Sequence, residues 1–222
     1  MSLAVVFFVG AAIAVLVVGF SFVRTEDRDV RSFGWGLVAT GVAFGFWAVA
    51  RIINSSDSDD LEVWITIGVL FLLVGLLVFL YAWAAQLERS LRDLVLVGGL
   101  VYLVVLIVVR FANPSEPFID AGILFFNPHG SVAALEVGAL TAAILPAIFG
   151  VSRRMRPRDA RVADSAFTAF LVSGIVLVTS VDRLLITIAS WVMVVVLVAL
   201  LATFVVRQPA RWLAQGHADS TD

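Results

Sequence analysis

The sequence contains no cysteine and no lysine, and it has few charged residues of either sign. All fifteen basic residues are arginine, and charged residues make up only 14% of the 222 positions. Without cysteine, the chain has no disulfide, no thiol nucleophile and no thiolate ligand for a metal. The absence of cysteine therefore excludes thiol catalysis and thiol-based redox relays.

Histidine and catalytic motifs are equally scarce. The only two histidines, His129 and His217, lie far apart in the sequence, which argues against haem ligation and a transition-metal site. The chain also lacks the HExxH, GxSG and GxGD motifs and the phosphate-binding P-loop. We therefore expect a protein that is not an enzyme and that holds no metal and no cofactor.

Hydrophobic residues, in contrast, are abundant. They make up 61% of the chain, and the mean hydropathy is +1.05. A soluble domain has roughly 45–50% apolar residues, and a core of this size cannot bury the excess, so the surrounding solvent is lipid. The net charge of −2 gives no reason to expect a nucleic-acid partner. The all-arginine composition and the acidic stretch Asp57–Asp60 indicate a haloarchaeal or actinobacterial source.

Seven apolar segments predict an all-α membrane helix bundle, since a span requires about 20 residues. They are Leu3–Val23, Phe33–Ile53, Val63–Gln86, Leu94–Val109 with an extension to Ala112, Val132–Val151, Ala163–Val181 and Leu184–Val206. The last two are divided at Asp182-Arg183. One helix over the whole interval between Arg161 and Arg207 would be about 68 Å long, which exceeds twice the hydrocarbon thickness.

The arginines are distributed unevenly between the two sides of the predicted bundle. Twelve lie in the first, third and fifth loops and the tail, whereas Arg51, Arg110 and Arg183 lie on the other side. The positive-inside rule places the twelve in the cytoplasm, so the N-terminus is expected outside the cell and the C-terminus inside. Residues 1–207 then form one multi-pass domain of the cell membrane, and residues 208–222 form a short polar cytoplasmic tail.

The densest basic run lies in the fifth loop. It consists of Arg153, Arg154, Arg156, Arg158 and Arg161. We expect this run to set the topology and to contact anionic lipid, with docking of a cytoplasmic signalling partner as the alternative. On the opposite side, Asn54 begins an N-glycosylation triplet, which occurs often by chance.

The longest loop, residues 113–130, contains three prolines, and this density rules out a helix through all of it. Its apolar centre, Ile123 to Phe126, predicts that it folds back onto the mouth of the bundle. Tryptophans such as Trp47 fall near predicted span ends, where interface anchors lie. The pair Gly41 and Gly45 predicts a close helix contact, either within the bundle or at a dimer face.

The outer mouth is the predicted functional site. Arg51, Arg110 and Arg183 reach it from three different spans, with Arg110 expected to extend toward the interface. Three guanidinium groups there would suit a carboxylate or a phosphate. The alternative is a salt-bridge lattice or contact with lipid headgroups, because several acids and one histidine lie at the same height. These residues are Glu62, Glu116, Asp120, His129, Glu136 and Asp182.

Glu136 is the clearest charge within a predicted span, and such charges indicate function. It is expected either to bind an ion, proton or ligand, or to pair with one of the outer arginines. The arrangement also contains a weak repetition. Arg51 and Arg110 each end a span, and Glu62 and Glu136 each begin the next one.

Two family resemblances follow from this layout. Seven spans in this length resemble microbial rhodopsins, but no lysine is present to form the retinal Schiff base, so retinal is excluded. The short charged first inner loop, the segment Phe33-Gly34-Trp35-Gly36 and the long outer loop more closely resemble the seven-span sensor region of archaeal and bacterial histidine kinases. This resemblance implies a sensor. Because no kinase segment follows Arg207, signalling would require a separate partner.

The leading functional hypothesis is a non-enzymatic seven-span sensor or receptor that binds a small anionic ligand or a lipid at its outer mouth. A small transporter or channel is the second hypothesis, and an accessory subunit of a membrane complex is the third. The expected partners are membrane lipids and either a cytoplasmic signalling protein or a second copy of the chain.

Overall fold

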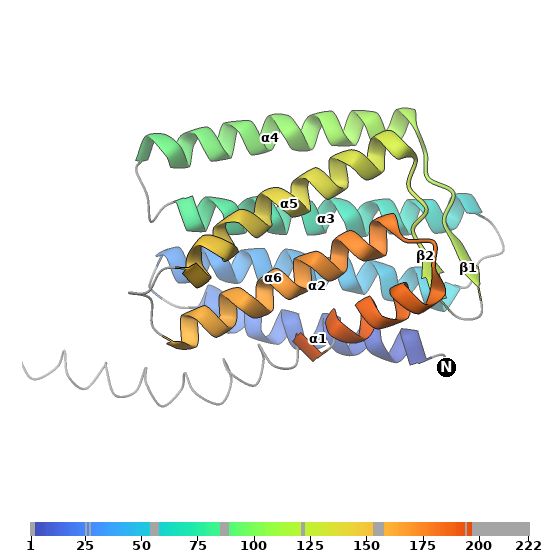
Figure 1. The fold of residues 1–222 in the computed structure, drawn as a ribbon, viewed down its shortest axis with the longest axis horizontal. Coiled ribbons are helices and arrows are strands. Elements are labelled where there is room, and N and C mark those ends of the chain that lie inside the picture. Colours follow the sequence, from blue (N-terminus) through green and yellow to red (C-terminus); the bar gives the residue numbers. More distant parts are fainter. Residues whose placement is uncertain are drawn as a thin grey trace, which may run out of the picture.

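The computed structural model describes residues 3–24, 26, 28–53, 58–84, 89–120, 123–152, 158–193 and 195–196. Its helices are α1 Leu3–Val23, α2 Arg28–Ile53, α3 Ser58–Ala84, α4 Arg89–Ala112, α5 Gly130–Ser152, α6 Arg158–Thr179 and a further helix over Arg183–Met193. Two short strands, β1 Phe118–Asp120 and β2 Ile123–Phe125, pair antiparallel between α4 and α5. The helices run alongside one another, and the strands lie at one end of the bundle, which we call the hairpin end (Figure 1).

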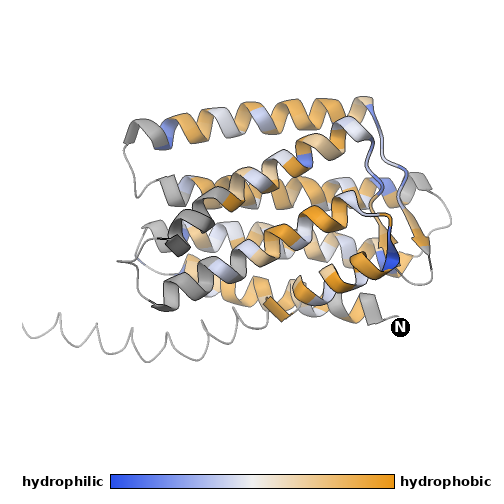
Figure 2. Cartoon of the chain, viewed as in Figure 1, coloured by the Kyte–Doolittle hydropathy of each residue, from blue (hydrophilic) through white to orange (hydrophobic). Residues whose placement is uncertain are grey.

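Three of the described helices contain stretches long and apolar enough to cross a membrane. These stretches are Arg31–Ile53, Leu61–Tyr81 and Arg92–Ala112. Shorter apolar stretches occupy the other described helices, namely Phe8–Val23, Gly130–Ile144, Thr168–Thr179 and Arg183–Met193. Hydrophobic residues predominate along all the helices (Figure 2). The chain is therefore a helical, membrane-embedded protein, as its composition predicts.

The helix bounds agree with the predicted segments at many ends and differ at others. α1 has the predicted bounds, and α4 ends at Ala112 as expected. However, α2, α3 and α4 each begin five residues before the apolar segment, at Arg28, Ser58 and Arg89. The apolar segments were bounded by hydropathy, whereas a helix satisfies its own backbone hydrogen bonds and continues through polar residues beyond the hydrocarbon.

Glycines allow α1 and α2 to pack closely. A Cβ atom added at Gly34 would lie 2.7 Å from the backbone nitrogen of Val23, and one added at Gly41 would lie 2.7 Å from Cγ of Leu16. A Cβ atom at Gly45 would meet nothing within 4 Å. Gly41 therefore makes the predicted close contact within the bundle, as small residues do in membrane helix packing, whereas Gly45 does not take part in it.

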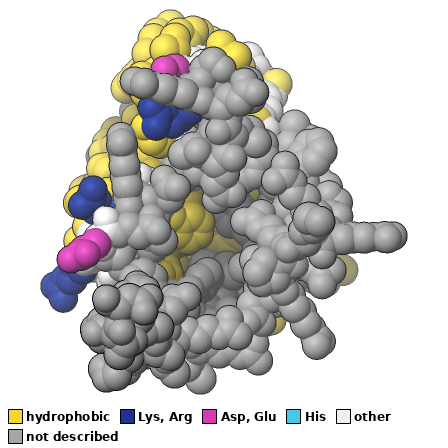
Figure 3. Space-filling model, turned by 90° about the vertical axis from the view of Figure 1, so that its left-hand side faces the viewer, with side chains coloured by type: hydrophobic (Ala, Val, Ile, Leu, Met, Phe, Trp, Pro, Cys, Tyr) yellow, Lys and Arg dark blue, Asp and Glu magenta, His cyan; other side chains and the backbone are white. Residues whose placement is uncertain are grey.

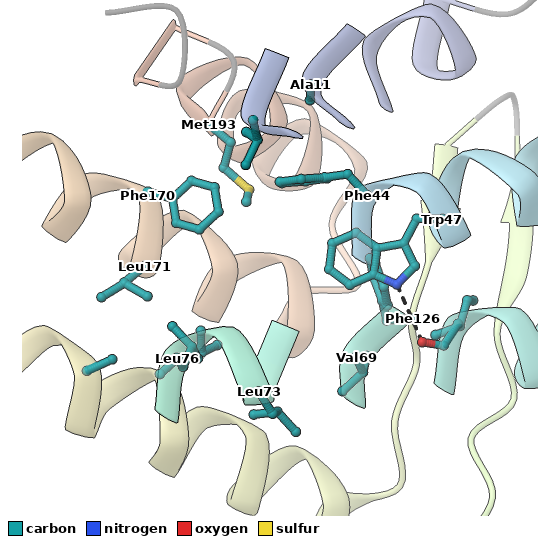
Figure 4. Close-up of a cluster of buried hydrophobic side chains, with 14 of the residues drawn as sticks. Ala11, Phe44, Trp47, Val69, Leu73, Leu76, Phe126, Phe170, Leu171 and Met193 are labelled. Carbon is teal, nitrogen blue, oxygen red and sulfur yellow. Dashed lines mark hydrogen bonds between the residues drawn. The ribbon is translucent and has the colours of Figure 1, made fainter. Parts of the chain in front are cut away.

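An aromatic cluster fills the core near the hairpin end (Figure 4). The ring of Trp47 lies 5.5 Å from that of Phe44 and 5.1 Å from that of Phe126, both edge-to-face. Its indole nitrogen donates to the carbonyl oxygen of Ile65 at 3.4 Å. The expectation that Trp47 is an interface anchor is therefore wrong. Its side chain is 5% exposed, and the α3 carbonyl satisfies its polar atom inside the bundle.

The long loop folds back onto the bundle as predicted. Leu124, Phe125 and Phe126 are all buried, and Phe126 packs against Trp47. The rings of Phe118 and Phe125 stack across the two strands at 4.6 Å. These contacts hold the loop against α2, next to the point where α4 ends.

α4 is the most exposed of the three long apolar helices. In its apolar stretch 11% of the residues are buried, against 61% for α2. Along its outer face Val97, Val104, Val108 and Phe111 are 58–74% exposed. On its inner face Leu106 is fully buried, and the Tyr102 hydroxyl donates to the Leu135 carbonyl oxygen at 2.6 Å.

Candidate functional site

A buried group of polar and charged side chains lies at the hairpin end. Arg110, in the last turn of α4, is 3% exposed. Its Nη1 atom donates to Glu136 Oε1 at 2.5 Å, and its Nη2 atom donates to Glu62 Oε1 at 3.3 Å. Its Nε atom donates to Thr66 Oγ1 at 2.9 Å. We call Arg110, Glu136, Glu62 and Thr66 the Arg110 cluster.

The directions of the helices bring the members of this cluster together. α4 ends at the hairpin end, whereas α3 and α5 begin there (Figure 1). Glu62 and Glu136 each stand five to seven positions into their helix, so both reach the depth of the last turn of α4. Thr66 lies four residues after Glu62, on the same face of α3, and donates to Glu62 Oε1 at 3.0 Å.

The loop after α4 also joins the cluster. The backbone nitrogen of Ser115 donates to Glu62 Oε1 at 3.2 Å, and Ser115 is 6% exposed. Glu62 Oε1 therefore accepts hydrogen bonds from Thr66, Arg110 and Ser115, which belong to α3, α4 and the loop. A single carboxylate oxygen thus links three segments of the chain.

The Arg110 cluster contains two carboxylates and one guanidinium group. A buried charge is tolerated only where partners replace the water that it has lost, and a guanidinium group has five donors to share among acceptors. The side chains of Glu136 and Arg110 are 5% and 3% exposed, whereas that of Glu62 is 16% exposed. Glu62 is therefore the charged member that lies nearest to solvent.

These contacts test two of the expectations about individual residues. Arg110 does not extend toward the interface, because its guanidinium group turns inward to Glu136 and Glu62. That expectation was wrong, since the buried carboxylates of α3 and α5 offer stronger partners than the interface does. The expectation that Glu136 pairs with one of the arginines Arg51, Arg110 and Arg183 is confirmed, and its partner is Arg110.

The other predicted mouth residues lie at the same end but have different environments. Arg51 is in the last turn of α2 and is 6% exposed. Asp182 and Arg183 are both exposed, and Asp182 Oδ1 accepts from the backbone nitrogens of Leu184 and Leu185 at 2.7 and 3.2 Å. Asp182 is therefore the N-cap of the last helix.

His129 is exposed just before α5, and its Nδ1 atom lies 3.1 Å from Ser131 Oγ. Of the predicted basic run, Arg153, Arg154 and Arg156 lie outside the described residues. Arg158 and Arg161 lie in the first turns of α6. Asn54 and the tail 208–222 also lie outside the described residues.

The opposite end of the bundle differs in character. Among the side chains described at this end, hydrophobic ones are visible together with a few charged ones (Figure 3). Arg92 and Asp93, near the start of α4, form a 3.7 Å ion pair with partly exposed side chains. Within the described part of the chain, buried ion pairs therefore occur at the hairpin end.

The sequence did not identify two residues of this region as site residues: Thr66, which belongs to the Arg110 cluster, and Ser115, which contacts it. Hydroxyl residues within spans are expected to bond to their own helix, as Thr40 and Ser173 do here. Thr66 differs because Glu62 precedes it by four residues, and this i, i+4 spacing of a carboxylate and a hydroxyl could have identified it. No comparable signal exists for Ser115, whose position depends on how the loop folds.

No protein-family model, no curated protein and no solved structure matches the chain. The geometry of the Arg110 cluster and the distribution of exposed residues must therefore support any functional proposal.

Proposed function

We propose that the protein is a non-enzymatic seven-span sensor or receptor of the cell membrane, with its N-terminus outside and its C-terminus in the cytoplasm. The observation that carries the proposal is the Arg110 cluster, which joins α3, α4, α5 and the loop through buried charges. Charges inside a membrane domain are costly and indicate function. A ligand that alters this cluster would shift three helices relative to one another, which is a recognised route for transmitting a signal.

The ligand in this proposal is a small anion or an anionic lipid headgroup at the hairpin end. Arg110 is 3% exposed and already donates to Glu136 and Glu62, so an anion has little access to it. Arg183 is exposed at the start of the last helix, so an anion reaches it without displacing either carboxylate. Arg183 would hold the ligand, and the Arg110 cluster would respond to it.

Signal output in this proposal passes through the cytoplasmic side. The basic run of the fifth loop would contact a separate signalling partner, as the resemblance to sensor regions of histidine kinases implies. The structure places Arg158 and Arg161 at the start of α6, at the end of the bundle opposite to the hairpin. Ligand site and output site would therefore lie at opposite ends of the same helices.

The test is thermal unfolding of the full-length protein in nanodiscs that contain either phosphatidylcholine alone or phosphatidylcholine with phosphatidylglycerol. We expect the anionic lipid to raise the Tm, because binding to the folded state stabilises it. The substitution Arg183→Gln should remove a large part of this rise, since one arginine contributes about 1 kcal/mol at an anionic surface.

Arg92→Gln is the matched control, because it removes one partly exposed arginine at the other end of the bundle. Its Tm in anionic nanodiscs should fall by less than that of Arg183→Gln. An equal response of both variants to phosphatidylglycerol would contradict ligand binding at the hairpin end. Native mass spectrometry of the parent protein would then show which lipid it retains.

A transporter receives less support. A transport route requires polar groups along the whole bundle, but five of the seven buried polar residues in the described chain lie at the hairpin end: Arg51, Thr66, Arg110, Ser115 and Glu136. The other two, Thr40 and Ser173, donate to carbonyl oxygens of their own helices. The described residues thus provide no polar path through the bundle.

An accessory subunit is the second candidate, and the outer face of α4 favours it. This face is apolar over the length of the helix, with Leu94, Val101 and Val108 each 58–66% exposed. Such a face fits lipid or a partner helix equally well. Native mass spectrometry distinguishes these cases, because a subunit would copurify with a stoichiometric protein partner.

A further inference from the structure

Two oxygen atoms, one in the Arg110 cluster and one beside it, are buried without a hydrogen-bond partner among the described residues. They are Glu62 Oε2 and Ser115 Oγ. Ser115 is 94% buried, since its exposed fraction is 6%. The two residues are in direct contact, because the Ser115 backbone nitrogen donates to the other oxygen of the same carboxylate at 3.2 Å.

This pattern is unusual for a carboxylate. Glu62 Oε1 accepts hydrogen bonds from Thr66, Arg110 and Ser115, whereas Oε2 accepts none from the described residues. The negative charge is shared by both oxygens, so leaving one buried and unsatisfied is costly. A ligand with positive charge that contacts Oε2 would remove this cost.

The charges in the cluster indicate that the ligand is positively charged. Within the hydrogen-bonded cluster, Glu62 and Glu136 carry two negative charges and Arg110 carries one positive charge. Arg110 is closer to Glu136 than to Glu62, with distances of 2.5 Å and 3.3 Å. The uncompensated negative charge therefore lies mainly on Glu62, which is also the more exposed of the two carboxylates.

The two unpartnered oxygen atoms indicate which kind of cation would bind. A carboxylate oxygen and a hydroxyl oxygen are hard donors that suit alkali and alkaline-earth cations. Divalent cations generally require several carboxylates, but the described residues contain no group of three or more histidine, cysteine, aspartate or glutamate residues that could hold a metal. One uncompensated charge and one available carboxylate oxygen fit a monovalent cation.

We propose that Glu62 Oε2 and Ser115 Oγ bind one monovalent metal cation, for which sodium is the probe, between α3 and the loop that follows α4. The cation would hold Ser115, and with it the loop, against the Arg110 cluster. This site shares Glu62 with the site of the proposed function, but its existence does not depend on the protein being a sensor.

The experiment is thermal unfolding of the full-length protein in phosphatidylcholine nanodiscs while sodium chloride replaces choline chloride at constant ionic strength. We expect a saturable rise in Tm with sodium, because a cation bound to the folded state stabilises it. Constant ionic strength removes general screening of surface charges from the comparison. Absence of a sodium-dependent rise in the parent protein would overturn the proposal.

Ser115→Ala removes the hydroxyl oxygen but keeps the backbone hydrogen bond to Glu62. We expect it to raise the half-saturating sodium concentration by about tenfold, the lower end of the effect of removing a group that supports a metal site. Ser190→Ala is the control, because this hydroxyl donates to the Ile186 carbonyl oxygen of its own helix. Equal sodium responses of the two variants would contradict the site and leave a water molecule as the occupant.

Glu62→Gln provides a second variant, in which a neutral amide replaces the carboxylate. It should abolish the sodium response whether or not its basal Tm changes. The sodium titration contains no anionic lipid, so its outcome is separate from the phosphatidylglycerol test. If the protein responds to sodium and not to phosphatidylglycerol, the cation site is supported and the proposed anionic ligand is contradicted.

Discussion

α2 and α4 end at the same side of the bundle, and each has a buried arginine in its last turn, but they are held in place differently. In the apolar stretch of α2, 61% of residues are buried, whereas 11% are buried in that of α4. α2 packs against α1 at Gly34 and Gly41 and contributes Phe44 and Trp47 to the core. Its contacts are distributed along its length.

α4 contacts the rest of the bundle along one narrow stripe. Going toward the hairpin end, this stripe contains Gly99 against Leu77, then Tyr102, then the buried Leu106, and finally Arg110. Two of these four contacts are polar. In a membrane the hydrophobic effect does not drive helices together, so packing and hydrogen bonds decide their association. α2 therefore depends on close packing, and α4 depends on a few polar contacts.

The largest expected effect comes from removing the polar contact at the end of α4. Arg110→Met retains an unbranched side chain of similar length but leaves Glu62 and Glu136 buried without their cation. We expect a loss of about 3–5 kcal/mol in the free energy of unfolding, the usual effect of breaking a buried ion pair. Chemical unfolding in detergent micelles measures it.

The control for this variant is Arg92→Met on the same helix, where the arginine is 23% exposed and pairs with Asp93. A partly exposed pair contributes about 0–1 kcal/mol, so this change should be small. Adding Glu62→Gln and Glu136→Gln to Arg110→Met should restore much of the lost stability, because no unpaired charge then remains. Equal losses in the two single arginine variants would show that α4 does not depend on the cluster.

A smaller effect is expected where α2 depends on close packing. The added Cβ atom of Gly34→Ala would lie 2.7 Å from the backbone nitrogen of Val23, and backbone cannot move aside as a flexible side chain can. Overpacking of this kind costs about 1–3 kcal/mol. Gly98→Ala on α4 is the matched control, because its Cβ atom would meet nothing within 4 Å. If both alanines destabilise equally, close packing is not what distinguishes α2.

Much of this difference between the helices could not be predicted from the sequence. Hydropathy predicted the bounds of α1 and the end of α4, because a long apolar run ends where charge or proline begins. It could not distinguish α2 from α4, since a lipid-facing valine and a buried valine have the same hydropathy. Trp47 illustrates the same limit, because its place near a helix end predicted an anchor, and tertiary packing made it a core residue.

The charged residues of the candidate site were predicted from the sequence, and so was the pairing of Glu136 with an arginine, but the identity of that arginine was not. Sequence placed Arg51, Arg110, Glu62 and Glu136 at one height, but it did not say which arginine each glutamate would contact. In the structure both glutamates contact Arg110. Which helices are neighbours decides this outcome, and helix order in space is not encoded in hydropathy or in arginine counts. The role of Ser115 depends further on the loop conformation.

The smallest expected effect tests the second polar contact of α4. Tyr102→Phe removes the hydroxyl that donates to the Leu135 carbonyl oxygen at 2.6 Å and leaves the ring in place. Hydrogen bonds between membrane helices contribute about 0.6 kcal/mol on average, so we expect a loss near this value in the same unfolding measurement. Tyr81→Phe, near the end of α3, is the control, because the ring of Tyr81 is stacked under Arg92 and survives the substitution.

A loss for Tyr102→Phe as large as that for Arg110→Met would mean that the polar contacts of α4 act as one cooperative unit. A loss indistinguishable from that of Tyr81→Phe would leave the Arg110 cluster as the dominant polar attachment of this helix.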